Sequence, residues 1–295
     1  DSFHYVDQWG PEHEADKAIQ YIKNEKGEFR KKDEPFALVV SMNPPHTPYN
    51  QVPQKYLDLY KDLDIDKISD RPNLPKENKT MYNHFRKNIV PYYAMITGVD
   101  EQVGRIVKAI EEADISENTI LLFTADHGCC LGIHGRKTKN NPYEESMRIP
   151  FMIRWPGKIK PGKEDLLLSV PDYYPTLLDL MGYENKIPAE LEGTSYASLF
   201  LGNEMEQKPT SQLYLQIPYK NEDYGIRGLR TAQFTFTWNI PVNGKAELVL
   251  FDNLNDPYQL KNIAGTQPET VRQLKAELKR WLEKTNDPWI KHFNE

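Results

Sequence analysis

The sequence contains only two cysteines, no long apolar run and no large excess of either charge. Cys129 and Cys130 are neighbours, and a disulfide between adjacent residues is strained, so the chain is not a disulfide-stabilised scaffold. No apolar stretch approaches the roughly 20 residues of a transmembrane helix, which argues against a membrane as partner. The net charge of -6, from 37 Lys and Arg against 43 Asp and Glu, argues against a dedicated nucleic-acid-binding protein.

The start of the chain, DSFHYVDQWG, has no initiator Met and neither the basic nor the apolar region of a signal peptide. The 295 residues suffice for one large α/β domain, or for a core with an appended subdomain. A change in the sequence pattern near residue 203 favours the second arrangement. We predict a core domain over residues 1–202 and a smaller subdomain over residues 203–295.

The core domain mixes strand and helix patterns. Short apolar runs, typical of strands buried on both faces, predict strands over residues 36–41, 120–124 and 150–157. Apolar residues at helical spacing predict helices over residues 15–24, 92–113 and 170–182. Residues 50–80 are charged and without a clear period, which indicates a surface excursion. Because a helix, a short turn and a strand in succession are typical of parallel sheets, we predict a mostly parallel sheet flanked by helices.

The subdomain has a different pattern. Three segments with no helix between them predict strands at residues 212–217, 228–238 and 247–252. A final amphipathic helix carries Val271, Leu274, Leu278 and Trp281 on one side. We therefore predict an antiparallel sheet with one helix.

Asp126 and His127 follow the predicted strand at 120–124. In open α/β sheets, ligands bind at the carboxyl ends of the strands. A carboxylate and an imidazole at this edge can bind a divalent cation, although two residues do not complete a metal site. The alternative is an aspartate that caps the next turn, beside a packed histidine.

His46 follows two prolines in a stiff loop after the predicted strand at 36–41. A rigid loop fixes an imidazole well, which suits proton transfer or contact with an anion. The alternative is an exposed loop histidine without a chemical role.

A cluster of cations, His134, Arg136, Lys137 and Lys139, follows within one loop. Lys139 could bind a tetrahedral anion, because an ammonium group is a compact charge with three donors. The alternative is a solvated charge run, which is the interpretation we favour for Lys137. Glu144 or Glu145 could order this basic loop by pairing with it.

Cys129 and Cys130 are candidates for a nucleophile or for metal ligands. The sequence has no C-x-x-C spacing, and adjacent cysteines do not easily chelate one tetrahedral ion. We interpret both as small, partly buried residues.

Five segments, taken in order, resemble the sulfatase family, the formylglycine-dependent branch of the alkaline phosphatase superfamily. They are PFALVVSMNPPHTPYNQVPQKYLDLY, YYAMITGVDEQVGRIVKAIEEADISENTILLFTADHG, LGIHGRKTKNNPYEESMRIPFMIRWPGKI, VPDYYPTLLDLMGY and LFDNLNDPYQLKNIA. They cover nearly the whole chain, and five in the family's order are strongly specific. The resemblance implies an alkaline-phosphatase-like α/β fold, incomplete at its N-terminus, with a smaller C-terminal antiparallel α+β subdomain.

The resemblance also implies a metal site. Asp126 and His127 match the family positions that ligate a divalent cation, usually calcium. Calcium prefers oxygen ligands, so the nitrogen of His127 leaves manganese and zinc open as alternatives.

The resemblance implies catalytic roles for two further residues. His46 matches the histidine that contacts the sulfate and donates a proton to the leaving alcohol. Lys139 matches the lysine that binds the sulfate oxygens and the bridging oxygen. His134 and Arg136 are the residues predicted to bind substrate.

Two departures from the family pattern limit what this chain can do. The family nucleophile is a cysteine or serine in the context C/S-x-P-x-R, oxidised to formylglycine, and this context is absent here. The paired aspartates that complete the family's metal site are absent too. We therefore expect the chain to be the C-terminal part of a longer enzyme, and to be inactive by itself. Its expected partners are the N-terminal portion of the same protein or a homo-oligomer partner.

The function that the resemblance implies is a sulfuric ester hydrolase acting on a sulfated carbohydrate or an aryl sulfate. One alternative is a phosphomonoester, phosphodiester or phosphonate hydrolase of the same superfamily, because sulfate and phosphate are both tetrahedral. Another is a non-catalytic module that binds sulfated glycans. The family implies a periplasmic or secreted location, with the cytoplasm as the alternative.

Overall fold

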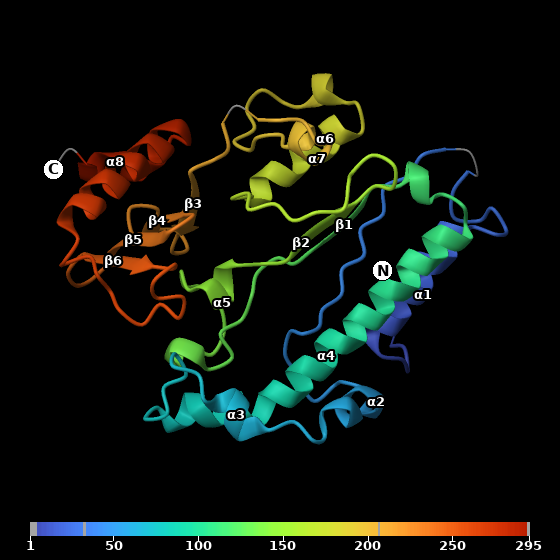
Figure 1. Ribbon diagram of the computed structural model, residues 1–295, viewed down its shortest axis with the longest axis horizontal. Coiled ribbons are helices and arrows are strands. Elements are labelled where there is room, and N and C mark those ends of the chain that lie inside the picture. Colours follow the sequence, from blue (N-terminus) through green and yellow to red (C-terminus); the bar gives the residue numbers. More distant parts are fainter. Residues whose placement is uncertain (1–4, 32–33, 206, 294–295) are drawn as a thin grey trace. The chain divides into compact units, whose positions relative to one another are not determined.

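The computed structural model describes residues 5–31, 34–205 and 207–293, which form two compact units (Figure 1). The first unit contains the described residues up to 138 together with 150–157, and the second contains 139–149 and the described residues from 158 onward. None of the described helices combines the length and apolar character needed to cross a bilayer. The domain boundary predicted after residue 202 stays a prediction.

The first unit is mainly helical. Its helices are α1 (Gly10–Lys23), α2 (Gln54–Leu57), α3 (Ile65–Ser69) and α4 (Lys79–Glu112). Its strands are β1 (Leu121–Thr124) and β2 (Phe151–Arg154). Helix α1 packs along α4 and buries Ala15, Ala18 and Ile22, so the helix predicted over 15–24 is confirmed with an earlier start.

Helix α4 begins well before the predicted start at residue 92, and Pro91 lies inside it. An internal proline removes one helical hydrogen bond and costs about 3 kcal/mol. The turns before Pro91 bury Phe85 and Ile89, and burying each such side chain contributes about 1.5–3 kcal/mol. Burial therefore offsets the proline, and the side chain of Asn78 caps the helix by accepting from Met81 N at 3.2 Å.

Residues 50–80 are not the surface excursion that the sequence predicted. They contain α2 and α3, and both Tyr56 and Leu74 are buried in the core against α4. Helix α2 buries Tyr56 alone and α3 buries only the polar Ser69, so these residues show no apolar period in the sequence.

The strand predicted over residues 36–41 is wrong. These residues have no strand partner among the described residues, and the side chain of Val39 is 90% exposed. An apolar run indicates that a segment suits a buried strand, but it does not show that the neighbouring strands are present.

The strands predicted over 120–124 and 150–157 are present as β1 and β2, which pair antiparallel with Thr124 opposite Phe151. This pair differs from the parallel arrangement that we expected for the core. Because the connection between β1 and β2 holds only short turns and one four-residue helix, no crossover helix brings the chain back in the parallel direction.

The second unit contains the predicted antiparallel sheet. Its strands run in the order β3 (Ser211–Gln216), β4 (Gly225–Thr231), β5 (Phe234–Ile240) and β6 (Glu247–Asp252). Its helices are α5 (Glu144–Met147), α6 (Tyr173–Leu180), α7 (Ala197–Phe200) and α8 (Pro268–Lys284). The apolar sides of α8 and the sheet form one core around Leu229, Phe236, Leu250, Leu278 and Leu282. The strands predicted at 212–217 and 247–252 and the final helix are thus confirmed. The segment predicted as one strand over 228–238 instead forms the end of β4, a turn and most of β5.

Gly132 permits a close approach between the segment after β1 and α4. Its φ is +110°, and a Cβ at this position would lie 2.4 Å from the main-chain oxygen of Met81. Because both the backbone angle and the contact disfavour a side chain, Gly132→Ala should lower the free energy of unfolding by about 2 kcal/mol or more, measured by chemical denaturation.

Gly104→Ala is the matched control for Gly132→Ala. Gly104 lies in α4, and a Cβ there would meet nothing within 4 Å. This substitution should stabilise the protein by up to about 1 kcal/mol, because alanine favours a helix over glycine. Equal effects of the two substitutions would contradict the close approach at Gly132.

Candidate active site

Asp126 and His127 stand together directly after β1. The main-chain N–H of His127 donates to Asp126 Oδ1 at 2.8 Å, and the ring Nε2 lies 3.1 Å from Asp126 Oδ2. The ring Nδ1 lies 2.8 Å from the carbonyl oxygen of Gly128. Because the side chain of Asp126 is 82% exposed, the carboxylate is accessible to a ligand.

These contacts are compatible with a metal ion at the pair, and the metal-binding role stays a prediction. A carbonyl oxygen only accepts, so Nδ1 of His127 donates its proton to Gly128. The ring Nε2 faces Asp126 Oδ2, and a proton or a metal cation between these two atoms would satisfy both of them. Metal-ligating histidines commonly donate their other N–H in this way. Asp126 and His127 therefore fit as two ligands of a divalent cation.

The pair does not make a complete metal site. Within the part of the chain that the structure describes, no group of three or more His, Cys, Asp or Glu side chains is placed to hold a metal ion. Calcium usually takes six to eight oxygen ligands, and zinc takes four ligands. A cation at Asp126 and His127 would need further ligands.

His46 lies in the proline-rich loop, between the cis peptide bonds Pro44–Pro45 and Thr47–Pro48. Its ring Nδ1 lies 2.9 Å from the carbonyl oxygen of Thr47, and its main-chain N–H donates to Asn43 O at 3.1 Å. The carbonyl of Thr47 accepts the proton on Nδ1 and thereby orients the ring. The residue is exposed, as an imidazole that contacts substrate must be.

Tyr49 connects the loop of His46 to the segment of Asp126. Its hydroxyl lies 3.9 Å from Cys129 Sγ, and its ring packs edge-on against Tyr92 of α4 with centroids 6.0 Å apart. Burial raises the pKa of Tyr49, and it raises the pKa of Tyr92 to about 12, so both remain neutral hydroxyls at physiological pH. Within the first unit, the structure thus links the His46 loop to the segment that follows Asp126.

The two cysteines pack in this region. Cys130 is buried, and Cys129 is half-buried between Tyr49 and the carbonyl oxygen of Lys137, which lies 3.8 Å from its Sγ. Neither cysteine forms a disulfide in the described part of the chain. These positions agree with our interpretation of both residues as small packing residues.

His134 and Arg136 occupy the turn after Gly132. The main-chain N–H of His134 donates to Asn73 O at 2.7 Å, and its ring Nε2 lies 3.2 Å from Nδ2 of the same asparagine. Asn73 is buried, so one side of the His134 ring faces the protein. Arg136 is exposed. The substrate-binding role of both residues stays a prediction.

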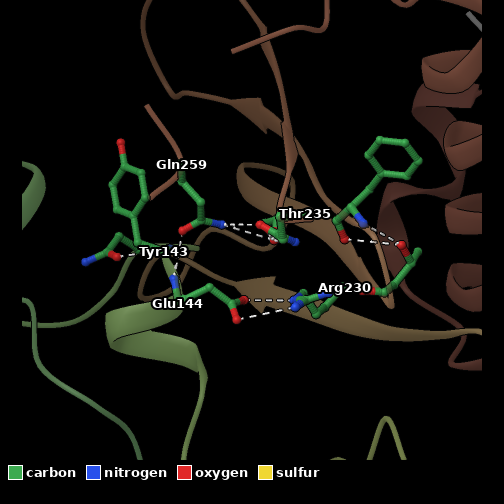
Figure 2. A network of polar contacts seen from close by, with 9 residues as sticks. Tyr143, Glu144, Arg230, Thr235 and Gln259 are labelled. Carbon is green, nitrogen blue, oxygen red and sulfur yellow. Dashed lines mark hydrogen bonds and ion pairs between the residues drawn. The ribbon is translucent and has the colours of Figure 1, made fainter. Parts of the chain in front are cut away.

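Lys139 lies in the second unit, at the start of residues 139–149, which we call the lysine segment. The segment contains α5, and the side chain of Glu144 pairs with Arg230 of β4 (Figure 2). The alternative that Glu144 pairs with the basic loop is therefore wrong. The structure also shows a second contact to Glu144 that the sequence analysis did not predict: the side-chain oxygen of Gln259 accepts from Glu144 N at 2.9 Å. No local sequence signal indicates Arg230 or Gln259.

Comparison with known proteins establishes the family. The sulfatase family model matches residues 12–183. The model described as N-sulphoglucosamine sulphohydrolase, C-terminal, matches residues 132–287. Because each match covers more than half of the chain, the chain belongs to the sulfatase family, as the resemblance implied.

Individual relatives extend this result. The chain is similar to an endo-4-O-sulfatase of Bacteroides thetaiotaomicron, with 38% identity over 303 residues that cover 97% of this chain and 58% of that protein. It is 31% identical over 280 residues to an ulvan-active sulfatase of Formosa agariphila, covering 90% of this chain and 52% of that protein. The chain spans about half the length of the curated relatives it matches.

The fold is shared with solved structures of the family. A Bacteroides fragilis protein described as a sulfatase, yidJ, aligns with a TM-score of 0.91 and 45% identity, covering 99% of this chain and 62% of that chain. This likeness confirms the alkaline-phosphatase-like α/β class with a small antiparallel subdomain.

Proposed function

We propose that the protein carrying this chain is a sulfuric ester hydrolase that removes sulfate from a sulfated sugar or an aryl sulfate. The observation that carries the proposal is the match of the sulfatase model to residues 12–183, which include His46, Asp126, His127 and Lys139. The names of similar proteins, an endo-4-O-sulfatase, an ulvan-active sulfatase and an N-acetylglucosamine-6-O-sulfatase, support a sugar sulfate as substrate class. We place the protein in the periplasm or outside the cell, as the family resemblance implies.

The proposed reaction needs positive charge and a proton donor. Negative charge grows on the leaving alcohol oxygen as the sulfur–oxygen bond breaks, and donors placed at such positions lower the barrier. In our proposal, the ammonium group of Lys139 donates to the sulfate oxygens, and His46 gives a proton to the alcohol. The contact between Nδ1 of His46 and Thr47 O supports this role, because it leaves Nε2 as the nitrogen that can deliver the proton.

Two groups implied by the family are not supplied by this chain alone. A divalent cation, when bound, adds positive charge at the sulfate oxygens, and Asp126 and His127 would be two of its ligands. Calcium is the family's usual ion, whereas the nitrogen of His127 also suits manganese or zinc. The formylglycine context C/S-x-P-x-R does not occur in this sequence. We propose that this residue lies N-terminal to the chain.

The metal assignment predicts a change in affinity. Asp126→Asn should weaken binding of a divalent cation at least tenfold, because a charged carboxylate ligand is lost. Isothermal titration of the protein with calcium, manganese and zinc measures the affinity and identifies the preferred ion. Asp62→Asn, at an exposed position between α2 and α3, is the control and should leave affinity unchanged. Equal affinities for the two variants would remove Asp126 from the site.

Matched esters separate the sulfatase from the other hydrolases of the superfamily. We expect kcat/KM for 4-nitrophenyl sulfate to exceed the values for 4-nitrophenyl phosphate and a phenyl phosphonate. A phosphonate monoester hydrolase of Agrobacterium radiobacter shares the fold with a TM-score of 0.68 at 20% identity, which shows the fold alone. A preference for phosphate or phosphonate would overturn the proposed function.

The non-catalytic alternative has a different signature. A glycan-binding module would bind sulfated oligosaccharides with no release of inorganic sulfate over many hours. We expect multiple turnovers by the protein that carries the formylglycine context, and none by residues 1–295 produced alone. Turnover by the 295 residues alone would contradict the placement of the nucleophile outside this chain.

A further inference from the structure

The lysine segment is attached to the four-stranded sheet through two adjacent residues, Tyr143 and Glu144. The Glu144 carboxylate accepts from Nε and Nη2 of Arg230 at 2.8 and 3.3 Å, in the two-point geometry that makes arginine–carboxylate pairs strong (Figure 2). The two side chains are only 20% and 29% exposed, so water screens the pair weakly. The ring of Tyr143 contacts Phe251 of β6, with centroids 5.7 Å apart.

The sheet residues that receive this segment form one row. In the strand register, Arg230 of β4 lies opposite Thr235 of β5, and Thr235 lies opposite Phe251 of β6. Directly opposite residues share one face of a sheet. Arg230, Thr235 and Phe251 are therefore neighbours on one face, where two of them contact the lysine segment.

Gln259 adds a third attachment with a fixed orientation. Its side-chain oxygen accepts from the main chain of Glu144 at 2.9 Å, while its side-chain nitrogen donates to Thr235 Oγ1 at 3.2 Å and to Asn253 Oδ1 at 3.0 Å (Figure 2). The residue is buried, and its φ is +50°. A buried amide with both ends bonded cannot turn without losing several bonds, so it holds the Glu144 backbone in place.

The link from this attachment to Lys139 is short. Five peptide bonds join Lys139 to Glu144, a span of at most about 18 Å when fully extended. Pro142 fixes one backbone angle within it, and Asn141 Oδ1 accepts from Tyr143 N at 3.2 Å in a local turn. The sheet contacts therefore restrict where the Lys139 ammonium group can lie.

We propose that Glu144, Arg230 and Gln259 are positioning residues that hold Lys139 against the anion. The proposal rests on the proposed function of Lys139. None of the three needs to touch substrate, because they act through the lysine segment. Misplacement of a catalytic group by 1 Å can lower a rate by about 100-fold, so the C-terminal sheet contributes to catalysis as well as to stability.

A double-mutant cycle tests the proposal in the protein that carries this chain. Arg230→Ala should lower kcat for an aryl sulfate by about 10- to 100-fold with a smaller change in KM. In a Lys139→Ala background, the same substitution should lower kcat by less than about twofold, because its effect passes through the missing amine. Arg272→Ala is the control, since Arg272 forms an exposed pair with Glu269 on α8, and it should leave kcat unchanged.

Amide hydrogen exchange gives a readout that does not depend on activity. Arg230→Ala should speed exchange in residues 139–149, while β5 and β6 stay protected. The proposal is overturned if exchange in the segment is unchanged, or if Arg230→Ala lowers kcat by the same factor with and without Lys139. An inactive wild-type protein would instead overturn the proposed function, and the exchange result would still report whether Arg230 holds the segment.

Discussion

Lys139→Ala should lower kcat for sulfate ester hydrolysis by about 100- to 1,000-fold in the protein that carries this chain. This is the typical loss when one donor to a developing negative charge is removed from an active site. In our proposal, Lys139 neutralises the sulfate oxygens and the bridging oxygen as the bond to the alcohol breaks. The measurement is steady-state kinetics with an aryl sulfate, using folded protein confirmed by circular dichroism.

Lys137→Ala is the matched control, because it removes the same charge two residues away. We interpret the side chain of Lys137 as solvated, and Lys137 is exposed in the structure. Its loss should change kcat by less than about threefold, since exposed charges are screened by water and salt. Equal losses for the two variants would indicate a general effect of positive charge and would remove the specific role of Lys139.

Asp287→Ala should lower the free energy of unfolding by about 3–5 kcal/mol, because it leaves a buried arginine without its counter-charge. Arg227 of β4 is fully buried and donates to Asp287 through Nε at 2.9 Å and Nη2 at 3.2 Å. It also donates to the carbonyl oxygens of Glu222 and Tyr224, and its guanidinium lies 4.7 Å from the ring centre of Trp289. Chemical denaturation followed by tryptophan fluorescence measures the loss.

Two further variants distinguish a buried charge from a general packing defect. Replacing both partners, Arg227→Met with Asp287→Leu, should destabilise the protein less than Asp287→Ala alone, because no unpaired charge remains. Glu269→Ala breaks the exposed pair with Arg272 and should cost no more than about 1 kcal/mol. If the double replacement is the least stable of the three variants, the contribution of Arg227 comes from its packing and its carbonyl contacts.

The sequence predicted those elements of the fold whose apolar residues follow a regular period. The C-terminal half of α4 and α8 show such a period, and both are present. The segment at 228–238, predicted as one strand, folds as β4 and β5 joined by a turn. Residues 50–80 show no such period, because their buried side chains, such as Tyr56 and Leu74, are irregularly spaced along the chain. The strand predicted at 36–41 is absent for another reason. None of the described residues buries the side chain of Val39, and a local apolar pattern carries no information about which neighbours are present.

The residues of the candidate site also fall into two groups, those that local sequence predicts and those that only the fold brings together. Asp126, His127 and His46 were predicted from local context, because each follows an apolar run or a proline pair, and the structure links their segments through Tyr49 and Cys129. Arg230 and Gln259 could not be predicted, since they lie 86 and 115 residues from the Glu144 that they contact. Only the folded sheet brings these partners together.

Hydrolysis of a sulfate ester in water enriched in ¹⁸O tests the proposed reaction most directly. Our proposal places bond cleavage between sulfur and oxygen, with Lys139 at the sulfate and His46 at the departing alcohol. We therefore predict that mass spectrometry finds the solvent label in the released sulfate and none in the alcohol. Label in the alcohol, or the absence of any released sulfate from the protein that carries this chain, would contradict the proposed function.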